Sequence, residues 1–313
     1  MAACMLADKV DKEFLDTAGP NLKIVSTMSV GYEHVDLQQL TDRGLRLGYT
    51  PDVLTDAVAD LSIMLALMAG RNSRETMSLV HNGEASISAC SIFHTHLSPT
   101  QWPSYPWSPF AFCGPQLSAN WLHPTRTAGF IGFGRIAQAT LARLVPFGFT
   151  HCLYTGNPAS APTPERDAAL ARTLGVESVR RVALHEVARE SDVVFVLAPG
   201  APSLRHVVDA EFLRGMKKTA VLVNTARGTL VDSDALARAL REGWLWGAGI
   251  DVVEGEPNVG ADHPLVKEPR CVVLPHIGSA TTETRLGMAT MAAKNLIAGV
   301  LGDTMPAELS ITR

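Results

Sequence analysis

Three side chains suited to binding or protonating an oxygen-rich substrate each follow a short apolar run: Arg227, Glu256 and His276. A guanidinium binds a carboxylate through two parallel hydrogen bonds. A histidine exchanges a proton near neutral pH, and a neighbouring carboxylate orients its ring. Taken singly, each is more often a surface charge, a turn residue or a structural hydrogen-bonding group. Three complementary groups after three predicted strands indicate a catalytic site.

A glycine-rich turn forms a second candidate site. Gly132, Gly134 and Ala137 match the pattern G-x-G-x-x-G/A, which is weak alone but here follows an apolar run and precedes a helical pattern. Gly132 allows a tight turn, Gly134 lets the backbone approach a pyrophosphate, and Ala137 keeps the helix close to the strand. The first N–H groups of the helix, around Arg135 and Ile136, suit an anion. The turn therefore predicts a dinucleotide site.

Strand patterns alternate with helical patterns along most of the chain, which predicts an α/β fold with a parallel sheet. The predicted strands are the run before Gly132 and residues 3–7, 23–27, 45–49, 152–155, 192–197, 220–225, 247–253 and 271–274. The main predicted helices are 11–18, 36–43, 55–68, 232–241 and 281–301. In a doubly wound sheet, ligands bind beyond the carboxyl ends of the strands, where the three candidate groups stand.

Composition bounds the class of protein. The 313 residues suit two domains, and a net charge of −4 argues against a nucleic-acid-binding surface. Five cysteines without a CxxC pair indicate neither a disulfide framework nor a zinc site, which predicts a reducing, cytoplasmic setting. No apolar run reaches the length of a membrane span, and the first residues lack the features of a signal peptide.

The order of these motifs resembles the D-isomer-specific 2-hydroxyacid dehydrogenases, and within them the glyoxylate reductase/hydroxypyruvate reductase branch. The resemblance rests on the glycine turn and on residues 224–228, 249–257 and 275–279, with support from 26–31, 48–56 and 153–156. It implies a doubly wound (Rossmann) dinucleotide domain inserted in a smaller, amino-terminally truncated flavodoxin-like substrate domain. The implied bounds are 50–280 for the first, and 1–49 with 281–313 for the second.

The resemblance also implies a reaction, in which a reduced nicotinamide transfers hydride to the C2 carbonyl of a 2-oxo acid. Arg227 anchors the substrate, His276 is the acid/base, and Glu256 supports the histidine. Further implied substrate-binding residues are Val30, Gly31 and Ser279. The implied cofactor-binding residues are Thr55, Gly132, Gly134, Arg135, Ile136, Asn157, Pro199, Thr225, Asp251 and Gly278. A homodimer formed through the region after residue 50 is the expected assembly.

The choice of cofactor depends on the end of the second strand of the dinucleotide fold, where NAD-binding folds place an acid on the ribose hydroxyls. Residues 153–160 contain no Asp or Glu, so nothing there repels a 2′-phosphate. We therefore expect NADP, with NAD possible. The related reductases carry an arginine where this chain has Asn157, and Arg166 is a candidate substitute.

Two stretches depart from the family pattern. Family members begin with a further strand–helix–strand portion, without which we expect an exposed apolar face. Residues 85–101 are irregular and added to the pattern, and His94 and His96 within them could chelate a metal. A surface insertion is the second interpretation, and a retained intron is the one we favour, so we expect no metal there and no contribution to the active site.

Three other functions remain open at this point. The chain could be another D-2-hydroxyacid dehydrogenase with a different side-chain pocket. It could be a non-enzymatic, nicotinamide-sensing co-repressor, since such proteins share the fold and the Arg/Glu/His set. It could also be an inactive truncated form.

Overall fold

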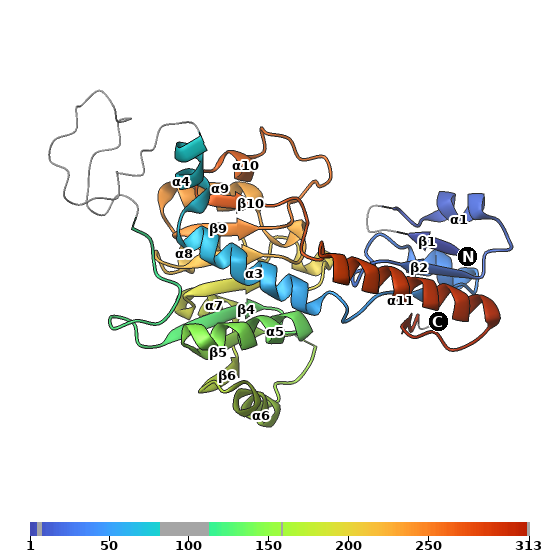
Figure 1. The fold of residues 1–313 in the computed structure, drawn as a ribbon, viewed down its shortest axis with the longest axis horizontal. Helices are drawn as coiled ribbons and strands as arrows, with labels where there is room; N and C mark the ends of the chain where they lie inside the picture. Colours follow the sequence, from blue (N-terminus) through green and yellow to red (C-terminus); the bar gives the residue numbers. More distant parts are fainter. Residues whose placement is uncertain (5–7, 82–112, 158, 312–313) are drawn as a thin grey trace. The chain divides into compact units, whose positions relative to one another are not determined.

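The computed structural model describes residues 1–4, 8–81, 113–157 and 159–311. The irregular stretch 85–101, with His94 and His96, lies outside the described residues. Backbone contacts divide the chain into a first unit, Met1–Ala59, Pro199–Ala201 and Ile277–Arg313, and a second unit, Asp60–Ala198 and Pro202–His276 (Figure 1). The first unit is discontinuous in sequence. The domain bounds at 49/50 and 280/281 stay a prediction.

The second unit contains a seven-stranded sheet in which neighbouring strands are parallel, in the order β10-β9-β8-β7-β4-β5-β6. The chain enters at β4, adds β5 and β6 on one side, and then returns to add β7 to β10 on the other. This is the doubly wound topology that was predicted, with its switch point between β4 and β7. The strands are β4 (Arg126–Ile131), β5 (Phe149–Thr155), β6 (Ser178–Arg181), β7 (Val193–Val196), β8 (Val221–Asn224), β9 (Gly247–Ile250) and β10 (Cys271–Val273).

Helices cover the sheet on both faces, which is why β7, β8 and β9 are buried at every residue. They are α3 (Thr55–Gly70), α4 (Ser73–His81), α5 (Arg135–Leu144), α6 (Pro164–Leu174), α7 (Leu184–Glu190), α8 (Ala210–Gly215), α9 (Ser233–Glu242) and α10 (Pro264–Lys267). The chain passes from the first unit to the second within α3. None of the helices in the described ranges combines the length and apolarity needed to cross a bilayer.

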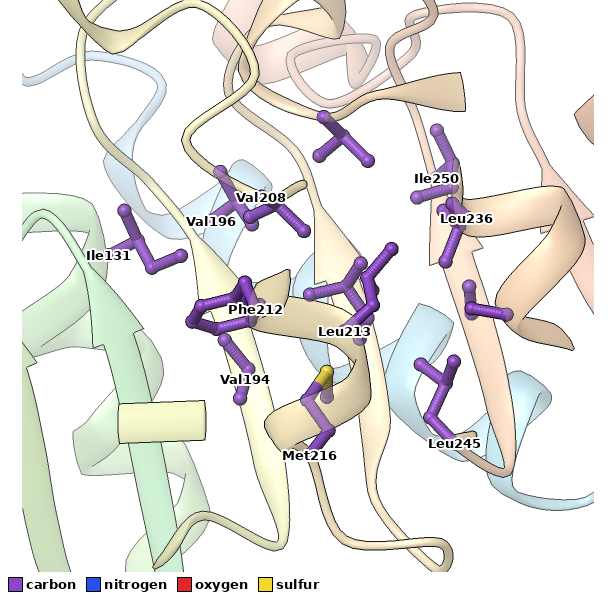
Figure 2. Close-up of a cluster of buried hydrophobic side chains, with 14 of the residues drawn as sticks. Ile131, Val194, Val196, Val208, Phe212, Leu213, Met216, Leu236, Leu245 and Ile250 are labelled. Atoms are coloured by element: carbon purple, nitrogen blue, oxygen red, sulfur yellow. The ribbon is translucent and has the colours of Figure 1, made fainter. Parts of the chain in front are cut away.

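Alternate residues of the central strands enter two separate cores. Val194 and Val196 of β7 lie in the core on which α8 packs with Phe212 (Figure 2). On the opposite face, Phe195 stacks on Phe130 of β4 with ring centroids 5.3 Å apart. Successive side chains of a strand point to opposite faces, so each central strand packs against both layers of helices. A shift in pairing by one residue would exchange the two faces, and burial on both sides therefore fixes the register of the strands.

The first unit has a four-stranded sheet in the order β1-β2-β3-β11, with β11 antiparallel to β3 and the other pairs parallel. The strands are β1 (Ala2–Cys4), β2 (Ile24–Thr27), β3 (Arg46–Gly48) and β11 (Glu308–Leu309), and the helices are α1 (Lys12–Ala18), α2 (Leu37–Asp42) and α11 (Thr282–Leu301). The strand expected at 3–7 is described at residues 2–4. The two-residue β11 was not predicted, because its pairing depends on β3 rather than on its own pattern.

Asn295 joins α11 to the edge of this sheet. It is fully buried, its Nδ2 donates to the carbonyl of Tyr49 at 3.0 Å, and its Oδ1 accepts from the N–H of Ala307 at 3.0 Å. A Cβ on Gly48 would lie 2.7 Å from the Asn295 Cβ, so the glycine is what lets the helix approach β3 so closely. One amide side chain therefore satisfies two backbone groups on either side of the antiparallel pair.

Replacing Asn295 by Ala should leave both backbone groups without their partner. Because each unsatisfied buried group costs about 1–3 kcal/mol, we expect the free energy of unfolding to fall by about 2–4 kcal/mol, measured by urea denaturation. Lys294→Ala, at the exposed neighbouring position, is the control and should change it by less than about 0.5 kcal/mol. Equal midpoints for the two variants would contradict this role of Asn295.

Candidate active site

The two glycines of the turn after β4 have different surroundings: Gly132 is closely packed, and Gly134 faces open space. Gly132 has φ +85°, and a Cβ there would lie 2.6 Å from the Cα of Ala198, so only glycine fits against the loop after β7. Gly134 is the N-cap of α5, has φ −85°, and a Cβ there would meet nothing within 4 Å. The first turn of α5 contains no acidic residue. Open space before an N-terminus without acids fits the pyrophosphate of a dinucleotide.

Asn157 lies in the exposed loop that follows β5. Its side-chain Oδ1 accepts from the N–H of Ala159 at 2.9 Å, and its carbonyl accepts from the N–H of Ser160 at 2.9 Å. The side chain of this predicted cofactor residue is therefore used to close the turn of its own loop.

Arg227 stands in the turn that follows β8, and the buried side chain of Asn224 shapes this turn. The Asn224 Nδ2 donates to the carbonyl of Arg227 at 2.9 Å, and its Oδ1 accepts from the N–H of Ala226 at 3.1 Å. A Cβ on Gly228 would lie 2.1 Å from the carbonyl carbon of Val253, so this turn packs directly on the backbone that follows β9. Asn224 and Gly228 thus hold the backbone that carries the arginine.

His276 and Glu256, predicted to act together, are hydrogen-bonded. His276 Nδ1 lies 2.9 Å from Glu256 Oε1, and each side chain is 32% exposed. An ionised carboxylate only accepts hydrogen bonds, so Nδ1 carries the proton in this hydrogen bond, and Nε2 is the ring nitrogen that does not contact Glu256. The His276 N–H also donates to the carbonyl of Asp251 at 2.8 Å. Its φ of +57° is uncommon for a residue other than glycine. Ring and backbone are therefore both fixed.

The strand β9 lies between the two candidate groups. Arg227 follows β8 and His276 follows β10, while Asp251, directly after β9, donates its N–H to the carbonyl of Asn224 at 2.9 Å. With neighbouring strands about 4.8 Å apart, β8 and β10 are separated by about 10 Å. The predicted nicotinamide residue Thr225 also lies here, with its hydroxyl 2.8 Å from that of Ser62 in α3.

The loop of Val30 and Gly31 belongs to the first unit, where a chain of hydrogen bonds holds it. The hydroxyl of Ser29 donates to the carbonyl of Gly31 at 2.6 Å. Because that hydroxyl has one proton, Ser29 accepts from the hydroxyl of Thr27 at 2.7 Å, and Thr27 in turn accepts from Nε2–H of His34 at 3.0 Å. The sequence reasoning missed all three supporting residues, because a lone Thr, Ser or His carries no distinctive pattern.

The remaining predicted site residues also lie in the first unit, and their participation in one site with Arg227 and His276 stays a prediction; they are Thr55, Pro199, Gly278 and Ser279.

A second histidine–carboxylate pair lies in the same unit as His276. His206 Nε2 is 2.7 Å from Glu254 Oε2, and Arg205 also binds Glu254. Burial would raise the pKa of Glu254, but the hydrogen bonds from His206 and Arg205 outweigh it and hold the pKa below its usual range. Because Arg205 and His206 both occupy this carboxylate, we interpret the pair as structural. It supplies a matched comparison for His276.

Among the described residues, no three His, Cys, Asp or Glu side chains gather in a way that could hold a metal ion.

Removing the amide of Asn224 should loosen the turn that carries Arg227. We expect Asn224→Ala to lower the free energy of unfolding by about 2 kcal/mol, because two hydrogen bonds to a buried side chain are lost. Asn258→Ala, an exposed position in the loop after β9, serves as the control. Urea denaturation of both variants measures the difference, and a loss no larger than that of Asn258→Ala would contradict the assigned role.

Comparison with known proteins identifies the family. The model of the D-isomer specific 2-hydroxyacid dehydrogenase NAD binding domain matches residues 101–278. The glyoxylate reductase/hydroxypyruvate reductase of Homo sapiens is 41% identical over 308 residues, which cover 98% of this chain and 83% of that protein. The glyoxylate reductase of Thermofilum pendens is 39% identical, over 97% of this chain and 79% of that protein.

Solved structures agree. The TT0316 protein from Thermus thermophilus superposes with a TM-score of 0.78 at 34% identity, covering 98% of this chain and 85% of that one. A glyoxylate/hydroxypyruvate reductase from Sinorhizobium meliloti, solved with NADP and malonate, gives 0.75 at 29% identity, covering 100% and 85%. The glycine turn and the three strand-end groups thus lie in a chain that belongs to the D-isomer specific 2-hydroxyacid dehydrogenase family.

Proposed function

We propose that this protein reduces glyoxylate, hydroxypyruvate or a similar short 2-oxo acid to the D-2-hydroxy acid. The observation that carries the proposal is the hydrogen bond between His276 Nδ1 and Glu256, at a sheet edge where Arg227 stands two strands away. The names of the similar human and Thermofilum pendens proteins support this class of substrate. A 2-oxo acid offers what these groups require, a carboxylate and a carbonyl oxygen on adjacent carbons.

Each of the three side chains has one task in this reaction. The guanidinium of Arg227 binds the substrate carboxylate and orients the carbonyl toward His276. The reduced nicotinamide, when bound, supplies the hydride that C2 receives. The protonated imidazole of His276 donates its Nε2 proton to the carbonyl oxygen, which becomes the hydroxyl. Glu256 accepts from Nδ1–H throughout, and so holds the ring and stabilises its charged form before the transfer.

NADP(H) is the proposed cofactor, with NAD(H) accepted less well. The pyrophosphate would lie on the N–H groups at the start of α5, around Arg135 and Ile136, in the open space before Gly134. Thr225 and Asp251 would line the nicotinamide. The loop after β5 has no acid to repel a 2′-phosphate, and the Sinorhizobium meliloti relative was solved with NADP.

Several residues of the first unit are proposed to bind ligands. The N–H groups of Val30 and Gly31 would bind a substrate carboxylate, and Ser279 would contact the substrate. Thr55, Pro199 and Gly278 would contact the cofactor. The hydrogen-bonded support of the Val30–Gly31 loop by Ser29 favours this role, because an oriented loop loses little entropy when it binds an anion.

The protein is further proposed to act as a homodimer in the cytoplasm. Met64 and Leu67 of α3 are large apolar side chains, 39% and 38% exposed, in the region after residue 50. Burying such side chains is a driving force for association. Cys4, Cys152 and Cys271 are buried thiols, in keeping with a reducing compartment. Light scattering should give the mass of two chains, and a monomer at working concentration would contradict the proposed assembly.

Steady-state turnover separates the candidate functions. We expect reduction of glyoxylate and hydroxypyruvate with a higher kcat/KM for NADPH than for NADH, and Asn157→Arg should widen the difference by adding a phosphate partner. Faster reduction of a 2-oxo acid with a larger side chain would favour another dehydrogenase of the family. Nicotinamide binding without turnover would favour the non-enzymatic sensor.

The assignment of His276 and Arg227 has its own test. His276→Ala should lower kcat about 10²–10⁴-fold, the range for loss of a general acid, with cofactor binding retained. Arg227→Ala should mainly raise KM for the 2-oxo acid. His206→Ala, which removes the other glutamate-bound histidine, should keep a kcat near that of the parent. If His276→Ala turned over as fast as His206→Ala, the proposed acid would be wrong.

A further inference from the structure

The loop after β5 poses a problem for a cofactor with a 2′-phosphate. In a doubly wound dinucleotide fold, the end of the second strand meets the ribose hydroxyls, and here that strand is β5. Residues 153–160 contain no lysine or arginine. The side chain of Asn157 accepts from the N–H of Ala159 in its own turn. A doubly charged phosphate would therefore find no cation within this loop.

Arg181, the last residue of β6, brings a cation to the loop from the neighbouring strand. It pairs in parallel register with Tyr154 of β5. Its Nη2 donates to the carbonyl of Asn157 at 2.7 Å, and its Nη1 donates to the carbonyl of Ser160 at 2.5 Å. A Cβ on Gly156 would lie 3.1 Å from the Arg181 Nε, so this glycine leaves room for the guanidinium against the strand end. The side chain is therefore held in place before any ligand arrives.

The charge of Arg181 is oriented by these contacts but not neutralised. Both acceptors are neutral carbonyls, and no carboxylate within the described ranges pairs with Arg181 in an ion pair. Guanidinium has five N–H donors, so donors remain for a further acceptor. The preceding residue behaves differently, since Arg180 Nη2 lies 3.7 Å from Glu190 Oε2. Adjacent residues of a strand point to opposite faces, so only Arg181 serves the β5 loop.

The pKa of Tyr154, at the end of β5, also reflects a positive charge from Arg181 nearby. Burial, followed by the hydrogen bond and the charge of Asp167, raises the pKa of Tyr154 to about 12, while the charges of Arg181 and Arg166 oppose the rise. Two arginine charges therefore act on the same strand end. Arg181 is the one that the loop carbonyls hold.

We propose that Arg181 binds the ribose 2′-phosphate of NADP(H), in place of the arginine that related reductases carry at the position of Asn157. The inference rests on the proposed use of NADP(H) and adds the residue that would select it. A phosphate oxygen would accept the remaining guanidinium N–H groups, and the two carbonyl contacts would keep the side chain oriented for it.

Arg181 could instead have a purely structural role, because it donates hydrogen bonds to the carbonyls of both Asn157 and Ser160 in the same loop. If holding the loop were its only function, its loss would weaken binding of phosphorylated and unphosphorylated adenosine ribose alike. If Arg181 binds the 2′-phosphate, its loss would weaken binding of the phosphorylated ligand only. The two roles are therefore separated by comparing ligands on the same variant.

The test is titration calorimetry with 2′,5′-ADP and with 5′-AMP, which differ by the 2′-phosphate, on the full chain. Arg181→Gln keeps an amide donor for the carbonyls and removes the charge. We expect about a 10- to 100-fold weaker affinity for 2′,5′-ADP, the range for a lost hydrogen bond to a charged group, and unchanged affinity for 5′-AMP. Arg181→Lys should recover part of the loss. Arg180→Gln, the matched loss of charge one residue away, should change neither affinity.

Two outcomes would overturn the assignment of Arg181. One is an equal loss of affinity for both ligands, which would leave only the loop-holding role. The other is unchanged binding of 2′,5′-ADP by Arg181→Gln. In both cases a parent protein that binds 2′,5′-ADP more tightly than 5′-AMP and reduces glyoxylate with NADPH would still support the proposed function. A parent that prefers 5′-AMP would instead overturn NADP(H) as the cofactor, and this inference with it.

Discussion

Parallel pairing of β8, β9 and β10 is the constraint on which the candidate site depends. In the observed register Asn224 pairs with Ile250, and Ile250 with Val273, so the three strands end at one level. Parallel strands send their carboxyl ends to the same edge of a sheet, and the residues that follow them begin there together. The segments that carry Arg227, Glu256 and His276 are distant in sequence and start from this one edge. A slip of one residue in any pair would turn its side chains to the opposite core.

Beyond that edge, backbone contacts hold the turns that carry the candidate side chains Arg227 and His276. Gly228 lets the turn of Arg227 lie on the backbone after β9, and the Asn224 amide closes that turn. The N–H of His276 is anchored on the Asp251 carbonyl, with the residue held at positive φ. An uncommon backbone conformation costs free energy and persists only where surrounding contacts impose it. Here the backbone of His276 is held while its ring is hydrogen-bonded to Glu256, as the proposed role in proton transfer requires.

Charged and polar groups along the same edge differ in whether their hydrogen-bonding capacity is already used. The start of α5 offers N–H groups without acids, Arg227 offers a fork for a carboxylate, and Arg181 offers a cation held by carbonyls. By contrast, Glu254 is occupied by Arg205 and His206. A cation whose contacts are neutral carbonyls can still bind an anion, whereas a carboxylate that already contacts an arginine and a histidine has its oxygens occupied. This difference in pairing separates candidate binding groups from structural ones.

The sequence by itself determined the fold class, because alternating strand and helix patterns and the turn at Gly132 and Gly134 are local features. It also gave Arg227, Glu256 and His276 as candidate site residues, since each follows an apolar run. It did not reveal β6 or β11, whose short segments become strands only by pairing with β5 and β3. The sequence also paired Glu256 with His276, and the structure added the atoms that meet, Nδ1 and Oε1. The tertiary structure alone decided that Asn224 shapes the turn of Arg227 and that the side chain of Asn157 contacts its own loop. It also brought Arg181 to that loop, because strand pairing sets which distant residues meet.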